Sequence, residues 1–149
     1  MIQLKEITPE NLDLVLLLKV SEVQKDFVSS PVYSLAQAYV YRETAYPFAI
    51  YADNTVVGFM MLGYYKEKNQ YTLWKLLIDE RFQNNGYGKE ALKLGIHYLV
   101  NRFQVKEVFT GVTFGNDIAK NLYQSFGFKE TGNHDEFQLE MKLEICDEV

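Results

Sequence analysis

The sequence predicts a single α/β domain, residues 1–149, in which one central sheet is flanked by about four helices. Short apolar runs rich in β-branched and aromatic residues alternate along the chain with segments whose apolar residues recur at helical spacing. The 149 residues are 48% hydrophobic and 23% charged, which suits one domain with its own core. No linker, internal repeat or low-complexity segment divides them.

The chain should begin with a strand and a helix. Residues 2–7 alternate between apolar and polar side chains, as a strand does. Thr8-Pro9-Glu10 then offers a hydroxyl N-cap, a proline at the first helical position and an acid in the first turn. We expect the buried face of this helix to carry Leu12, Val15, Leu16 and Val20.

A second helix is expected at residues 34–43, after Ser29-Ser30-Pro31 interrupts the chain. Its inward positions should be Leu35, Ala38 and Tyr39. Tyr46-Pro47 should end it, because the residue before a proline disfavours helical backbone angles.

The rest of the chain predicts five strands and two helices. Asp53-Asn54 is a tight-turn pair between the predicted strands at 48–52 and 55–62. In order, the elements are strands at 48–52, 55–62 and 71–78, a helix at 89–102, a strand at 105–112, a helix at 117–126 and a strand at 137–143.

A glycine loop, Gln83-Asn84-Asn85-Gly86-Tyr87-Gly88, lies between the predicted strand 71–78 and the predicted helix 89–102. A turn of this kind aims backbone N–H groups and the positive end of the helix dipole at one point, which favours an anion such as a pyrophosphate. Gly86 and Gly88 lack Cβ atoms, so a ligand can approach the backbone closely.

This Gln-x-x-Gly-x-Gly loop resembles the acetyl-CoA loop of the GNAT family of N-acetyltransferases. Residues 116–128 resemble the family's other signature, Asn-x-x-Ala-x-x-Leu-Tyr-x-x-x-Gly-Phe, and follow the loop in the family's order. The resemblance covers essentially the whole chain. It implies the GNAT (acyl-CoA N-acyltransferase) fold, with a mixed sheet splayed between the strands near 71–78 and 105–112.

The resemblance implies acetyl-CoA as co-substrate and assigns residues to it. The pantetheine arm should lie along the strand at Leu76, Leu77 and Ile78, where an N–H near Leu77 or Ile78 would polarise the thioester carbonyl. The pyrophosphate should lie on the backbone of Gln83, Asn84, Asn85, Gly86, Tyr87, Gly88 and Lys89.

Two residues of the second signature also receive roles from the resemblance. Asn116 would hydrogen-bond the pantetheine; it can equally cap the helix that follows, and the two roles are compatible. Tyr123 is the expected catalytic residue, protonating the leaving thiolate, and the alternative is an aromatic residue on a buried helix face.

The sequence names no general base and no metal site. The strand before the loop offers Trp74 and Lys75 rather than an acid, and Asp79 and Glu80 can be solvated or cap the loop. A water chain that ends on a backbone carbonyl is an equal candidate. His97 and His134 have no cluster of metal ligands around them, so no metal is expected.

The chain resembles one branch of the family more closely, the bacterial spermine/spermidine (diamine) N-acetyltransferases. Residues 20–28 look like a helix of that branch with the pattern Val-Ser-x-x-Gln-x-x-Phe/Tyr-Val. Residues 57–61 look like its third strand, and residues 78–83 look like its entry to the glycine loop. The resemblance implies a small polyamine as acceptor, attacking in a ternary complex, although Trp74 stands where the branch commonly has an acid. The expected acids for the distal ammonium are Glu22, Asp26 and Glu43.

Three other functions remain open from the sequence. They are acetylation of a peptide or protein, acetylation of another small-molecule amine, and a non-catalytic acyl-CoA-binding sensor on the same fold.

Charge and cysteine content restrict the partners and the compartment. The net charge of −5 argues against nucleic acid, which needs clustered Lys and Arg. The lone Cys146 excludes a disulfide within the chain. With no signal-like N-terminus and no membrane-length apolar run, we expect a reducing cytoplasm and no membrane partner. Whether the protein is a monomer or a homodimer stays open.

Overall fold

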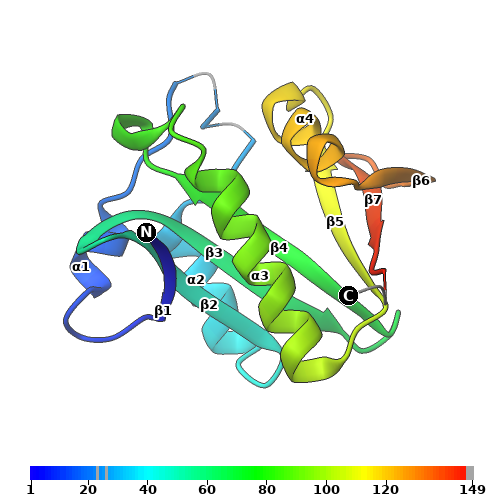
Figure 1. The fold of residues 1–149 in the computed structure, drawn as a ribbon, viewed down its shortest axis with the longest axis horizontal. Coiled ribbons are helices and arrows are strands. Elements are labelled where there is room, and N and C mark those ends of the chain that lie inside the picture. Colours follow the sequence, from blue (N-terminus) through cyan, green and yellow to red (C-terminus); the bar gives the residue numbers. More distant parts are fainter. Residues whose placement is uncertain (23, 26, 147–149) are drawn as a thin grey trace.

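The computed structural model describes residues 1–22, 24–25 and 27–146, and in this part of the chain seven strands form one mixed sheet in the order β1-β2-β3-β4-β5-β7-β6 (Figure 1). The α/β class is therefore confirmed. The strands are β1 Ile2–Glu6, β2 Ala45–Ala52, β3 Thr55–Tyr65, β4 Gln70–Ile78, β5 Glu107–Thr113, β6 Lys129–His134 and β7 Gln138–Glu144. The helices are α1 Leu12–Leu16, α2 Pro31–Val40, α3 Tyr87–Phe103 and α4 Asp117–Phe126, with a 3-10 turn η1 at Glu80–Phe82.

The predicted splay of the sheet is present between β4 and β5. These two strands run parallel and pair at Thr72 with Phe109 and at Leu73 with Thr110. Beyond those pairs the strands diverge, as the ribbon shows, with the glycine loop at one tip and α4 at the other (Figure 1). The C-terminal half of β4 therefore has a backbone edge without a strand partner on the β5 side.

The two faces of the sheet have separate cores. Helix α3 covers one face, where Leu92, Ile96 and Leu99 pack with residues of the sheet and with Tyr123. Helices α1 and α2 cover the other face, where Val15 and Ala38 belong to the second core (Figure 1). The central strand β3 is buried on both faces, which fixes β4 beside it.

The first helix differs from its prediction. The N-cap position is Asn11 rather than Thr8, and the Thr8 N–H donates to Asn11 Oδ1 at 2.8 Å. The helix ends at Leu16, so Val20 lies outside it, and Leu12 is exposed while Val15 is buried.

The second helix starts where the sequence predicted a break. Ser30 is its N-cap, with Oγ accepting the Tyr33 N–H at 3.1 Å, and Pro31 takes the first helical position. Ala38 is buried and Leu35 half-buried, but Tyr39 is 71% exposed and was wrongly predicted to face inward. The helix also ends earlier than predicted, at Val40.

The third correction concerns Pro47, which lies inside β2 instead of ending a helix. The ladder between β1 and β2 stops at Phe48, so the missing N–H of Pro47 costs no hydrogen bond to β1. The sequence also missed β6, and His134, predicted to lie in a turn, is the last residue of that exposed strand.

Candidate active site

A cavity of about 680 Å³ opens where β4 and β5 diverge, and we call it the glycine-loop cavity. Of the predicted cofactor and catalytic residues, only Asn85 does not line it. The predicted residues that it brings together are Leu76, Leu77, Ile78, Gln83, Asn84, Gly86, Tyr87, Gly88, Lys89, Asn116 and Tyr123.

The glycine loop turns into α3 through left-handed backbone. Asn84 has a φ of 67° and Gly86, at the N-cap of α3, has a φ of 77°. The Glu90 N–H donates to the Gly86 carbonyl oxygen at 3.2 Å, as the first hydrogen bond of the helix. The N–H groups of the preceding first turn have no acceptor within the helix and are available to an anion in the cavity.

Side chains of the loop hold its shape. Gln83 Nε2 donates to the carbonyl oxygen of Ile78 at 2.9 Å and to Gln24 Oε1 at 2.8 Å. Asn85 Nδ2 donates to the carbonyl oxygens of Phe82 and Gln83 at 3.0 and 3.3 Å. These amides therefore brace the loop and leave ligand binding to its backbone.

Asp79 caps the turn before the loop, one of the two roles left open for it. Its carboxylate is buried and accepts the Arg81 N–H and Nε–H at 2.9 and 2.8 Å and the Lys19 N–H at 3.0 Å. Burial raises the pKa of Asp79, but these donors outweigh burial and hold it below its usual range. A carboxylate so fully bonded is a poor general base.

Strand alternation decides which backbone groups of β4 face the gap. The Asp79 N–H donates to the Val57 carbonyl oxygen on the β3 side at 2.8 Å. Because successive residues of a strand point their N–H and C=O groups to opposite sides, Leu77 also faces β3, whereas Leu76 and Ile78 face the gap. The Ile78 carbonyl oxygen indeed meets Gln83 there. Of the two expected oxyanion donors, the geometry favours Ile78 over Leu77.

Tyr123 extends from α4 to the wall of the glycine-loop cavity and is 7% exposed. Burial raises its pKa to about 12, against the smaller opposite effect of a hydrogen bond with the Thr110 side chain. The same hydroxyl, which has a single proton to donate, lies 3.0 Å from the Leu73 carbonyl oxygen, so β4, β5 and α4 meet at this point. Tyr123 keeps its proton at neutral pH and can act as a donor.

Asn116 takes the helix-capping role that the sequence allowed. Its Oδ1 accepts the Ala119 N–H at 3.3 Å at the start of α4. It also lines the glycine-loop cavity, so capping leaves it beside any ligand there.

The charged side chains among the described residues of the glycine-loop cavity are all positive. Among the described residues that line it, the charged side chains are Lys75 and Lys89, and no carboxylate lines it. Two cations and a helix N-terminus fit a ligand with phosphate groups. No cluster of metal-ligating side chains occurs in residues 1–22, 24–25 and 27–146.

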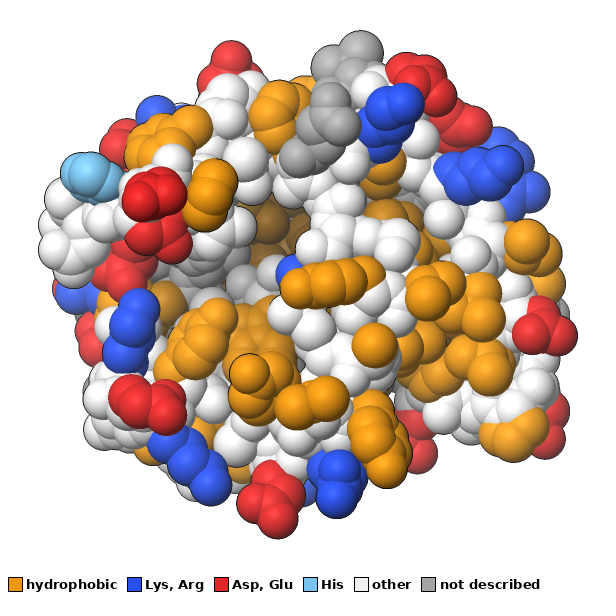
Figure 2. Space-filling model, turned by 180° about the vertical axis from the view of Figure 1, so that it is seen from behind, with side chains coloured by type: hydrophobic (Ala, Val, Ile, Leu, Met, Phe, Trp, Pro, Cys, Tyr) orange, Lys and Arg blue, Asp and Glu red, His pale blue; other side chains and the backbone are white. Residues whose placement is uncertain are grey.

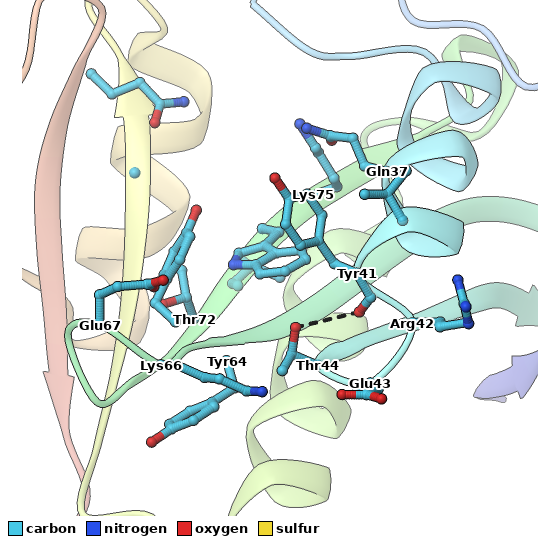
Figure 3. A pocket seen from close by; sticks show the side chains of 16 residues that line it. Gln37, Tyr41, Arg42, Glu43, Thr44, Tyr64, Lys66, Glu67, Thr72 and Lys75 are labelled. Carbon is cyan, nitrogen blue, oxygen red and sulfur yellow. Dashed lines mark hydrogen bonds between the residues drawn. The ribbon is translucent and has the colours of Figure 1, made fainter.

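A second cavity of about 690 Å³, which we call the aromatic cavity, lies between the end of α2, the β3–β4 turn and β4 (Figure 3). Trp74 forms part of its wall, with the ring centroids of Tyr41 and Tyr65 at 6.2 and 5.3 Å from that of the indole. The indole packs directly on Gly63, where a Cβ would collide with it. The face that carries α1 and α2 is hollowed near its centre, with hydrophobic side chains around the hollow (Figure 2).

The aromatic cavity also contains polar groups without a protein partner. In the described part of the chain, the buried Oγ1 of Thr72 and Nε1 of Trp74 have no hydrogen-bond partner. Buried polar atoms are normally paired, so these two are suited to a polar ligand. The carboxylates of the cavity are Glu43 and Glu67.

The two cavities meet at four residues that line both: Trp74, Lys75, Gly111 and Gln138. We call these residues the neck. Gly111 allows close approach there, because a Cβ at this position would collide with the Gln138 side chain. A glycine inside a strand pattern is a sequence signal for such an approach. Gln138 and Thr110 carried no signal in the sequence, since only folding brings them to the site.

The acids expected to hold a distal ammonium are only partly placed at these cavities. Glu43 lines the aromatic cavity. Glu22 instead forms an exposed ion pair with Lys25 at 2.8 Å and lines neither cavity. Asp26 lies outside the described residues. The described residues of segment 20–28 form turns rather than the predicted helix.

Comparisons with known proteins agree with this architecture. Residues 16–128 match the model of the acetyltransferase (GNAT) family. Over 142 residues the chain is 32% identical to the spermine/spermidine N(1)-acetyltransferase of Bacillus subtilis strain 168, covering 90% of this chain and 91% of that protein.

Solved structures share the fold at lower identity. The spermidine N-acetyltransferase of Vibrio cholerae, in complex with CoA and spermine, superposes with a TM-score of 0.75 at 15% identity, covering 96% of this chain and 95% of that one. The PaiA N-acetyltransferase of Thermoplasma acidophilum, in complex with CoA, gives 0.72 at 17% identity, covering 97% and 99%. Within the described residues, the helices are too short or too polar to cross a membrane.

Proposed function

The chain belongs to the acetyltransferase (GNAT) family, and we propose that it transfers the acetyl group of acetyl-CoA to a primary amine of a small polyamine such as spermidine or spermine. The observation that carries this proposal is the meeting of two cavities at one neck. The cavity with cationic and helix-terminal groups suits CoA, and the cavity with aromatic rings and carboxylates suits an amine. Both substrates can then be present together, and the amine attacks directly in a ternary complex.

The glycine-loop cavity has the groups that CoA needs. We assign the pyrophosphate to the first-turn N–H groups of α3, with Lys89 beside them. The pantetheine arm would pair with the free edge of β4, whose ladder with β5 ends at Leu73. This arrangement directs the thioester carbonyl to the Ile78 N–H, which is suited to stabilise the developing oxyanion.

Tyr123 is the proposed proton donor of the reaction. When the amine nitrogen forms its bond to the carbonyl carbon and the C–S bond breaks, the leaving sulfur takes up negative charge. A protonated phenol in the wall of the cavity can donate to that sulfur. The amide nitrogen releases its remaining extra proton through water, which restores Tyr123.

Polyamine as the acceptor rests on the curated relative and on the aromatic cavity. The relative with 32% identity acts on spermine and spermidine according to its name. In this chain, the rings of Tyr41, Tyr65 and Trp74 provide faces that attract a cation. Glu43 and Glu67 provide local negative charge, in a cavity that is also lined by Arg42, Lys66 and Lys75. Trp74 thus stands in the aromatic wall, at the position where the branch commonly has an acid.

We predict a faster reaction with spermidine than with a monoamine of similar length, because only spermidine has distal ammonium groups to bind in the aromatic cavity. The advantage should decrease with added salt, since partly exposed charges are screened. The measurement is the initial rate of CoA release for both amines at several salt concentrations. Equal rates for the two amines at low salt, or activity on peptide N-termini alone, would contradict the polyamine assignment.

A further inference from the structure

Lys75 brings a positive charge to the place where an amine and a thioester would meet. It extends from β4 toward α2 and is one of the four residues of the neck (Figure 3). Its Nζ donates to Ser29 Oγ at 2.9 Å and lies 5.8 Å from the centroid of the Tyr33 ring. The side chain is half-buried, and among the described residues it forms no ion pair with a carboxylate.

Among the described residues, no carboxylate at the neck compensates the charge of Lys75. The two acids of the aromatic cavity, Glu43 after α2 and Glu67 in the β3–β4 turn, do not line the neck. Arg42 and Lys66, from the same two segments, add further positive charge to that cavity. On the other side, the glycine-loop cavity contributes Lys89 from α3.

The titratable groups that remain are tyrosines. Tyr33 and Tyr41 come from α2 and its end, Tyr64 and Tyr65 from β3, Tyr87 from α3, and Tyr123 from α4. Burial raises the pKa of Tyr65 and that of Tyr123, so both stay neutral at physiological pH. The described neck therefore contains a cation and no base of the carboxylate type.

We propose that the ammonium charge of Lys75 makes the acceptor ammonium release its proton to water at the neck, in place of a carboxylate base. This inference rests on the proposed acetyl transfer and names the group that prepares the amine for it. The acceptor nitrogen loses one proton to water before attack. It then bonds to the carbonyl carbon, the C–S bond breaks, and a second proton from that nitrogen reaches the sulfur by way of Tyr123.

The physical reason is repulsion between two ammonium groups in a half-buried space. A like charge within reach disfavours the charged form of its neighbour, and desolvation acts in the same direction. Burial already lowers the pKa of Lys75 itself, so the neck disfavours ammonium ions. The Ser29 hydroxyl oxygen accepts a hydrogen bond from Lys75 Nζ, and this bond favours the protonated, charged form of Lys75 over that of the acceptor amine.

The test is the pH dependence of kcat with the amine and acetyl-CoA both saturating, because kcat reports the pKa of groups in the bound complex. In the wild-type protein, kcat should rise with pH to a midpoint below the pKa of the free amine. Lys75→Met should move this midpoint upward by about 1–2 pH units. Lys75→Arg should keep the wild-type midpoint, because a guanidinium retains its charge and cannot act as a base.

A weakly basic amine provides the control for structural damage. A fluorinated primary amine that is already neutral at the assay pH should react equally well with the wild-type protein and with Lys75→Met. A midpoint that does not move in Lys75→Met, or a loss that is equal at every pH and for both amines, would overturn the inference. Lys75→Arg behaving like Lys75→Met would also overturn it, by identifying Lys75 as a base.

The outcomes separate this inference from the proposed function. A wild-type protein that acetylates no amine contradicts the proposed function. An active wild-type protein with an unmoved midpoint contradicts the role of Lys75 alone.

Discussion

Tyr123→Phe is expected to lower kcat by about 10²–10⁴-fold, the usual contribution of a general acid, with little change in the Kd of acetyl-CoA. The substitution removes a hydroxyl whose pKa burial raises to about 12, and which is therefore protonated at neutral pH. The ring and its contact with Phe128, at 5.6 Å between centroids, remain. The measurement is steady-state kcat with the best acceptor, together with calorimetric titration of CoA.

Tyr98→Phe is the matched control. It removes a phenol hydroxyl from α3 that accepts a hydrogen bond from Arg102 and lines neither cavity. Its kcat should equal that of the wild-type protein. If Tyr123→Phe stays within about twofold of wild type, far below the contribution of a general acid, proton donation by Tyr123 is wrong.

Gly88→Asp is expected to weaken CoA binding by on the order of 10²-fold or more, because it places a carboxylate beside the N–H groups assigned to the pyrophosphate. The fold should persist. A Cβ at Gly88 meets Leu122 at 3.6 Å and Ile78 at 3.8 Å, which are ordinary contacts. Gly86→Asp would report less cleanly, since the φ of 77° at Gly86 strains any residue with a side chain.

Asn101→Asp is the matched control for Gly88→Asp, because it adds the same negative charge near the opposite end of α3. The Asn101 side chain is exposed and lines neither cavity. Calorimetry should show CoA affinity close to that of wild type in this variant. A folded Gly88→Asp protein with unchanged CoA affinity would remove the pyrophosphate from the glycine loop.

Elements with local signals at both ends were predicted well. Helix α4 has the predicted bounds because Asn116 caps its start and Gly127, with a φ of 117°, ends it. The glycine loop was located for the same reason, since its backbone turn depends on residues within the loop. The residues predicted for the cofactor from the two signatures line one cavity, with the exception of Asn85.

Predictions failed where tertiary contacts outweigh local preference. Pro31 and Pro47 were both interpreted as breaks, yet one starts α2 and the other lies in β2 where β1 no longer pairs. Tyr39 is exposed because the buried stripe of α2 runs through Pro31, Ser34 and Ala38, and Tyr39 lies beside that stripe. Strand β6 is polar and exposed, so it shows no alternation, and pairing with β7 alone defines it.

The acceptor side of the site was the least predictable part. Lys75 lies next to Ser29, and Thr110 next to Tyr123, across long separations in the sequence. The register between β3 and β4 shifts at Met61 and Leu62. The β4 side chains therefore do not alternate regularly between the two faces across this bulge. Periodicity therefore could not place Trp74 and Lys75 together in the neck.

The most direct test of the central claim is identification of the product by mass spectrometry after the protein is mixed with acetyl-CoA and spermidine. The account predicts spermidine acetylated on a primary amine and free CoA in equal amounts, with no product when either substrate is omitted. Free CoA without acetylated polyamine, or no turnover by a folded protein that binds CoA, would contradict polyamine acetylation in a ternary complex.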